Sequence, residues 1–126
     1  MSTLNGGPGI VTNGLVLYLD AANPASYVSG STAWNDLTRN GNNGTLTNGP
    51  TFNSSNLGNI VFDGVDDFVG VTNPTNLQMQ NFTLSMWVYP TTATFAIADL
   101  IDYDHASTPF HGWVIQSEDA TTNRYY

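Results

Sequence analysis

Residues 58–71 read GNIVFDGVDDFVGV, and this stretch decides the fold class. Two short apolar runs, residues 60–62 and residues 68–69, flank the polar sequence DGVDD. Gly64 can adopt the positive φ that a tight turn requires, and the Asp side chains can accept hydrogen bonds from turn amides. We therefore predict a β-hairpin whose two arms are these apolar runs.

Alternating apolar residues predict further strands on both sides of this hairpin. Leucines occupy every second position of residues 14–20, and residues 82–90 alternate between an apolar face and an amphipathic face that ends at Pro90. Shorter strands are expected at residues 51–52, 97–102 and 113–116. No segment repeats its apolar residues with the helical period, and turn signals recur at intervals of about 8–12 residues. The fold class is therefore all-β, a sandwich or a barrel.

The chain of 126 residues has the length of one domain. Residues 1–13 contain Gly, Pro and Asn without a regular period, so we expect a flexible N-terminal arm there and a single domain over residues 14–126.

Composition excludes several classes of partner. The net charge is -8, Arg39 and Arg124 are the two cationic residues, and there is no Lys to neutralise a row of phosphates. There is no Cys, which excludes disulfides and thiolate chemistry. No apolar run is long enough to span a bilayer, and the opening residues do not have the pattern of a secretory signal. Nucleic acid binding and membrane insertion are therefore not expected.

Several phrases together resemble the laminin-G-like branch of the concanavalin A-like lectin/glucanase superfamily. They occur in the family's order, and they are GLVLYLD at residues 14–20, WNDL at 34–37, NGNNGTL at 40–46, VFDGVDDFV at 61–69 and FTLSMWVYP at 82–90. The family's usual Ser-Gly before the Asn-Gly-Asn loop is replaced here by Arg39 and Asn40.

The resemblance implies a jelly-roll of two curved antiparallel sheets. Domains of this family continue well past the position at which this chain stops, so the resemblance also implies sheets that are incomplete at the C-terminus. An open edge carrying Tyr125 and Tyr126 would be an association surface. We therefore expect a homo-oligomer or incorporation into a larger assembly.

Catalysis is not expected. Glucanases of the superfamily use two carboxylic acids that flank the scissile bond, usually both Glu. Here Glu118 is the single Glu, and it lies in a polar terminal stretch. Asp102 and Asp104 share a face of an extended strand, but they could act as an acid and base pair only if burial separated their pKa values. We predict that the chain is not an enzyme.

Two interpretations of the Asp cluster at residues 63–67 remain open. Asp63, Asp66 and Asp67 could converge on one calcium ion, because hard cations take six to eight oxygen ligands. Alternatively, Asp63 and Asp66 cap the amides of the turn, which requires no metal. The rest of the sequence requires no cofactor. Calcium is the ion that this Asp cluster could bind.

A second candidate site is the stretch between the last two predicted strands. Aromatic rings beside short polar groups suit sugar recognition, because a pyranose presents both C–H patches and hydroxyls. The candidate glycan-binding residues are Tyr103, Asp104, His105, Phe110, His111 and Trp113. In the alternatives, Trp113 belongs to the core, Phe110 plugs an interface, or the two His residues with Asp104 hold a metal, although their spacing matches no zinc pattern.

Three functions of different classes follow. The first is a non-enzymatic structural or adhesion protein of a virion, a phage capsid-decoration or tail-fibre component. Its partners would be other virion protein chains or further copies of itself, with a cell-surface glycan as an additional ligand. The second is an extracellular carbohydrate-binding module of a larger secreted bacterial protein. The third, a glycan hydrolase, is disfavoured by the absence of a Glu pair.

Overall fold

The computed structural model describes residues 10–72, 75–77, 79, 81–91, 98–103 and 113–117. Within these residues the fold is all-β, as predicted, and its helical elements are two short 3-10 turns. The chain divides into two units, one ending at Phe82 and the other beginning at Thr83, and each is described separately. Among the described residues, no helix has the length and apolar character needed to cross a membrane.

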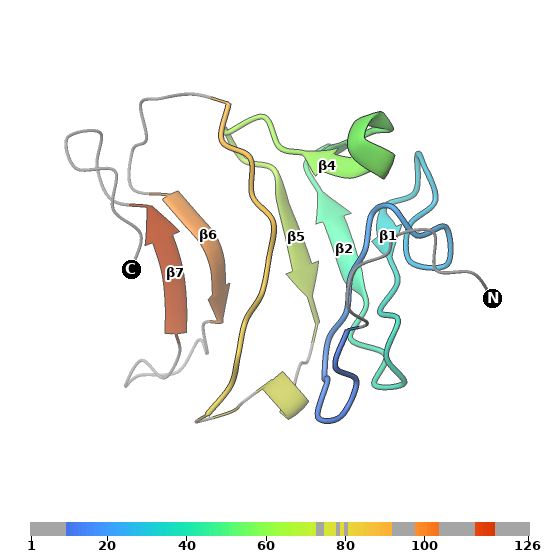
Figure 1. The fold of residues 1–126 in the computed structure, drawn as a ribbon. Coiled ribbons are helices and arrows are strands. Elements are labelled where there is room, and N and C mark those ends of the chain that lie inside the picture. The colour runs from blue at the N-terminus through green and yellow to red at the C-terminus, as the bar shows by residue number, and fades with distance from the viewer. Residues whose placement is uncertain are drawn as a thin grey trace. The chain divides into compact units, whose positions relative to one another are not determined.

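The first unit is built on a three-stranded antiparallel sheet of order β1-β2-β5 (Figure 1). The strands are β1 (Ala33–Trp34), β2 (Gly44–Thr47) and β5 (Phe68–Val71). Gly44 lies opposite Val71, and Thr47 lies opposite Phe68. A Cβ atom added to Gly44 would lie 2.7 Å from Cγ1 of Val69, so the centre of this sheet requires a residue without a side chain.

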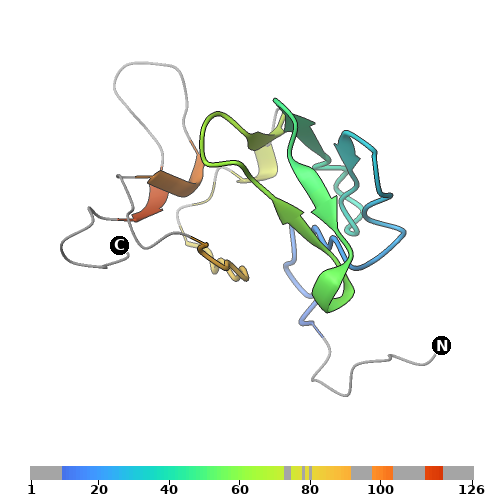
Figure 2. The ribbon, with the colours of Figure 1, turned by 90° about the horizontal axis from the view of Figure 1, so that it is seen from above.

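A second antiparallel pair consists of β3 (Thr51–Asn53) and β4 (Asn59–Val61). The 3-10 turn η1 (Ser55–Leu57) joins these strands and closes one end of the pair (Figure 2). Asn56 and Leu57 have positive φ, and Gly58 follows with φ 131°. A Cβ atom at Gly58 would lie 2.8 Å from the carbonyl oxygen of Ala21, so both the backbone conformation and the close approach favour glycine there.

The prediction that residues 60–62 and 68–69 pair with each other is wrong. Strand β4 pairs with β3, whereas β5 pairs with β2. Residues 44–53 and 59–71 therefore form the two arms of one long antiparallel hairpin. The ladder of this hairpin is interrupted by residues 48–50 on one arm and residues 62–67 on the other. The polar sequence after Phe62 is a loop within the second arm.

Hydrogen bonds within this loop explain why its two flanking segments do not pair with each other. The side chain of Asp63 accepts hydrogen bonds from the amides of Val65 (2.8 Å) and Asp66 (3.4 Å), and the carboxylate of Asp67 accepts one from the amide of Asp63 (2.9 Å). Because side chains close the turn, its flanking backbones are free to pair with other strands. The side-chain amide of Asn48 donates to the carbonyl oxygen of Asp66 (2.8 Å), so the two interruptions of the ladder are bonded to each other.

Residues 14–20, predicted as a strand, belong to no ladder among the described residues. Side chains take the place of the missing strand on one side of the segment. Asp36 accepts the amide of Tyr18 (3.0 Å), and Asn42 donates to the carbonyl oxygen of Val16 (2.8 Å). Ser26 accepts the amide of Asp20 (3.1 Å). Bonds at every second residue are what an extended segment provides on one edge.

The core of the first unit lies between its sheet and the segment before β1. Tyr27 and Leu46 are the buried apolar side chains of the described residues, at 4% and 6% exposure. The ring of Tyr27 contacts Trp34 edge-on and Phe52 at a tilt, with ring centroids 6.1 and 5.4 Å apart. The hydroxyl of Ser26 is fully buried, and it donates to the carbonyl oxygen of Asn35 (2.6 Å).

The second unit contains the antiparallel hairpin of β6 (Ala98–Tyr103) and β7 (Trp113–Ser117), which confirms the strands predicted at residues 97–102 and 113–116. The ladder is irregular between Asp99 and Ile101. Residues 82–90, predicted as the clearest strand, belong to no ladder in the described part of the chain. They run as an extended trace without a turn (Figure 1).

Candidate functional sites

The Asp cluster at residues 63–67 exists as a spatial group. One carboxylate oxygen from each of Asp63, Asp66 and Asp67 can be chosen so that all three lie within 4.8 Å of one another. The turn-capping interpretation is confirmed for Asp63, whose side chain accepts two amides. It is wrong for Asp66, whose side chain caps no amide among the described residues, while Asp67 supplies the second capping carboxylate.

The cluster is therefore a self-capped loop with spare carboxylate oxygens. Asp63 and Asp66 are exposed, and Asp67 is half-buried, so water competes for each of them. Calcium would need further oxygens beyond these three side chains, from loop carbonyls or water. Calcium binding stays a prediction.

The predicted glycan loop is described only at its two ends. Tyr103 and Trp113 lie opposite each other where β6 ends and β7 begins. Their rings are stacked, with centroids 6.3 Å apart and planes at 22°, and both side chains are half-buried. Asp104, His105, Phe110 and His111 lie outside the described residues. The structure thus brings together two of the six predicted residues and leaves the glycan interpretation a prediction.

Asp102 lies on a strand, as predicted, but it does not meet the condition that the acid and base interpretation sets. It lies in β6 opposite Val114, but its side chain is exposed, and its predicted partner Asp104 falls outside the described residues. Asp102 therefore lacks the burial that this interpretation requires.

Asp36 is the most highly bonded carboxylate of the described residues, and sequence reasoning gave it no role. It accepts hydrogen bonds from the amides of Tyr18, Thr38 and Asn42 and from the hydroxyl of Thr38. Burial acts to raise the pKa of Asp36, but the hydrogen bonds from Thr38, Tyr18 and Asn42 outweigh it and lower the pKa below 3.8. The signal in the sequence was Asp36 followed by the Asn-rich run at residues 40–43.

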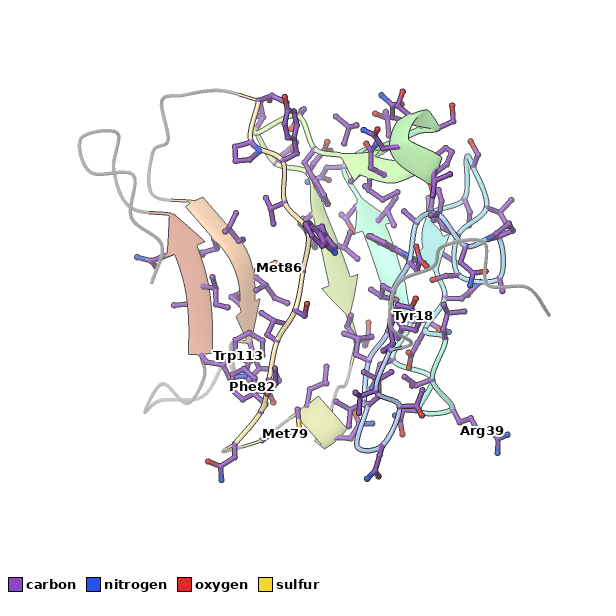
Figure 3. All side chains as sticks on the ribbon, viewed as in Figure 1. Tyr18, Arg39, Met79, Phe82, Met86 and Trp113 are labelled. Carbon is purple, nitrogen blue, oxygen red and sulfur yellow. The ribbon has the colours of Figure 1, made fainter. Side chains whose placement is uncertain are left out.

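The loop around Asp36 is structural rather than a ligand clamp. Asn43 accepts the amide of Asp36 (2.9 Å), and Asn40 donates to the carbonyl oxygen of Val16 (3.1 Å). Arg39 points away from the unit into solvent (Figure 3). The side chains of Asn40, Asn42 and Asn43 are thus engaged in hydrogen bonds within the fold.

A surface hollow of about 410 Å³ lies within the first unit. Tyr27 and Leu46 form its floor with the half-buried Phe52. Its rim is small and polar, and the residues that line the hollow are Tyr27, Ser29, Gly30, Ser31, Thr32, Leu46, Asn48, Gly49, Pro50, Thr51 and Phe52. None of them is charged. Sequence reasoning missed this site because its residues come from two separate stretches, 27–32 and 46–52, that no single motif spans.

The extended segment of residues 83–91 is the third candidate surface. Trp87 is fully exposed and Tyr89 is 89% exposed, while Met86 and Val88 are exposed by 39% and 50%. Figure 3 labels Met86 on this segment. Within the described part of the chain, the backbone of residues 83–91 makes no hydrogen bond. The segment therefore presents exposed apolar side chains, and its peptide groups pair with none of the residues described in its unit.

No protein-family model, no curated protein and no solved structure matches this chain. The similarity to the laminin-G-like family therefore stays a prediction from the quoted phrases.

Proposed function

We propose that this protein is a non-enzymatic structural or adhesion component of a virion, a phage capsid-decoration or tail-fibre protein that acts by assembling with other protein chains. We also propose that its β-sheets form a laminin-G-like jelly-roll. The observation that carries the proposal is the segment at residues 83–91, whose backbone has no hydrogen-bond partner in the described part of its unit and whose Trp87 and Tyr89 are exposed.

Unpaired strand edges are the parts of a β protein that attract other chains. Natural proteins protect such edges with charges or short strands, whereas residues 81–91 contain no charged residue. A fully exposed Trp beside an exposed Tyr is the composition that is enriched in protein interfaces. A chain that works by assembly has a use for this surface, and an isolated soluble protein does not.

The location in a virion is supported by composition alone. The chain has no Cys, no Lys and a polar surface rich in Asn and Thr, which suits a particle exposed to varied surroundings. The test is mass spectrometry of purified particles from a virus that encodes the chain, followed by immunogold labelling. Stoichiometric recovery and regularly spaced label would support the proposal. Absence from purified particles that contain their other structural proteins would overturn it.

The surface hollow favours a second candidate function, a carbohydrate-binding module of a secreted protein. An apolar floor with hydroxyl and amide groups around it suits one face of a neutral sugar ring. The hydroxyls of Ser29, Thr32 and Thr51 make no hydrogen bond to other described residues, so they are available to a ligand.

A glycan array followed by NMR titration tests this second candidate. Binding of a neutral glycan should shift the resonances of Tyr27 and Phe52 and should be lost in Ser29→Arg, which fills the rim. Ser54→Arg, an exposed change outside the hollow, is the matched control. Binding that survives Ser29→Arg would place any glycan site elsewhere.

A further inference from the structure

We propose that the fold directs spontaneous deamidation of this chain to Asn13, because the first unit holds the side chains of its other Asn-Gly pairs. Residues 10–72 contain four such pairs, which begin at Asn13, Asn40, Asn43 and Asn48. The proposal concerns chemical modification of the protein and does not depend on the proposed function.

The reaction of an Asn-Gly pair needs no enzyme. The backbone nitrogen of the glycine attacks Cγ of the Asn side chain, and a new N–C bond forms. The side-chain nitrogen leaves as ammonia, taking the proton of the glycine amide, and water then opens the cyclic imide to give Asp or isoaspartate. Glycine favours the attack because it has no Cβ atom in the way. The Asn side chain must turn toward its own backbone, so a hydrogen bond that holds it elsewhere slows the reaction.

The side chain of Asn40 is held by the segment of residues 15–20 and by its own loop. Its nitrogen donates to the carbonyl oxygens of Val16 (3.1 Å) and Leu15 (3.4 Å) and to the hydroxyl of Thr38 (3.1 Å). These bonds must break before Cγ of Asn40 can reach the nitrogen of Gly41. Deamidation there therefore requires local opening of the first unit.

Asn43 and Asn48 flank β2, and each is held by a residue outside its pair. The side-chain oxygen of Asn43 accepts the amide of Asp36 (2.9 Å), and the following Gly44 is buried in the central strand of the sheet. The side-chain nitrogen of Asn48 donates to the carbonyl oxygen of Asp66 (2.8 Å). In both pairs the group that has to rotate is thus fixed by another part of the first unit.

Asn13 lies in an exposed turn. The amide of Leu15 donates to the carbonyl oxygen of Thr12 (3.2 Å), so Asn13 and Gly14 are the two central residues of the turn. Gly14 has φ 78°, and both central residues are exposed. The bond that closes the turn uses neither the side chain of Asn13 nor the N–H of Gly14. Both reacting groups are therefore at the surface, and the Asn13 side chain bonds to none of the described residues.

The products would also differ in their effect on the fold. At Asn40, deamidation would replace the donor to Val16 with a carboxylate that repels the carbonyl oxygen. At Asn48, the bond to Asp66 would be lost in the same way. At Asn13, the new carboxylate would lie in water and replace no bond to a described residue. The pair that reacts is therefore the pair whose loss the first unit tolerates.

Ageing of the folded chain at mildly alkaline pH, followed by peptide mapping, tests the proposal. Mass spectrometry detects the replacement of an amide by an acid, and fragmentation assigns it to one pair. We expect Asn13 to react at least about fivefold faster than each of the three held pairs, the factor that one hydrogen bond contributes. In urea the four pairs should react at nearly equal rates, because unfolding releases the held side chains. The pair at Asn5 lies outside the described residues and is assigned separately by the same fragmentation.

Asn13→Gln is the matched variant, because its longer side chain disfavours the cyclic imide. It should abolish the reaction at residue 13 and leave both the melting temperature and the rates at the held pairs unchanged. Equal rates at all four pairs of the folded chain, or a faster reaction at a held pair, would overturn the proposal. It would also be overturned if Asn13 kept its full advantage in urea, because the local sequence would then set the order of reaction.

Discussion

Residues 15–20 and residues 83–89 have the same pattern in the sequence and different surroundings in the structure. Both alternate apolar residues, both were predicted as strands, and neither belongs to a ladder among the described residues. The first segment is bonded to the side chains of Asp36, Asn42 and Ser26. The second segment has no such bonds in the described part of the chain. Alternation therefore indicates that a segment needs a partner, and it does not indicate which partner satisfies it.

The largest effect is expected for Asp36→Ala. The carboxylate accepts four hydrogen bonds, one from the amide of Tyr18 and three from Thr38 and Asn42 in its own loop, and its loss leaves those donors without this partner. We expect the free energy of unfolding to fall by about 3 kcal/mol, measured by urea denaturation. Asp66→Ala, whose carboxylate bonds to no described residue, is the control and should change stability by less than about 0.5 kcal/mol. Equal effects of the two changes would mean that side chains do not hold the first segment.

A smaller loss is expected for Ser26→Ala. The hydroxyl is fully buried, and it bonds both the amide of Asp20 and the carbonyl oxygen of Asn35. Removing it leaves both backbone groups without this partner, at an expected cost of about 2 kcal/mol in thermal or urea unfolding. Ser29→Ala, an exposed change three residues later, serves as the control. A neutral Ser26→Ala would show that the bond to Asp20 is dispensable for this segment.

Acid should loosen the first segment through Asp36. Its pKa is lowered in the folded chain, so its contribution to stability is present above the unfolded value near 3.8 and is lost as pH falls through the lower folded value. As pH falls below about 4, the melting temperature of the natural chain should fall more steeply than that of Asp36→Asn. Parallel slopes for the two proteins would assign the acid sensitivity to other carboxylates.

The sequence predicted the fold class and the positions of several strands and turns better than it predicted which strands pair. The all-β class and the strands β6 and β7 were predicted because they depend on short-range alternation. The turn at Gly64 was also predicted, because its Asp side chains bond nearby amides. The pairing of β4 with β3 and of β5 with β2 was missed, because a self-bonded loop and a hairpin turn have the same local sequence. Pairing depends on contacts far apart in the chain.

The candidate sites divide in the same way. Asp63, Asp66 and Asp67 are neighbours in the sequence, so their clustering was predictable. The hollow over Tyr27 and the bonds of Asp36 join separate segments, and no short motif describes either. The sequence therefore located the exposed loop that is rich in carboxylates and missed Asp36, the carboxylate that accepts the most hydrogen bonds among the described residues.

The smallest effect is expected when calcium is removed. The two Asp-containing loops of the first unit use their carboxylates differently. The carboxylate of Asp36 bonds to another segment, whereas those of Asp63 and Asp67 bond within their own loop. A loop that already caps its own amides does not need a cation to fold. Dialysis against EDTA should leave the melting temperature unchanged, and Asp66→Asn should behave like the natural chain with and without calcium. A rise in melting temperature on adding calcium that Asp66→Asn abolishes would show instead that the spare oxygens of this loop form a metal site, because only a ligand that binds the folded chain stabilises it in this way.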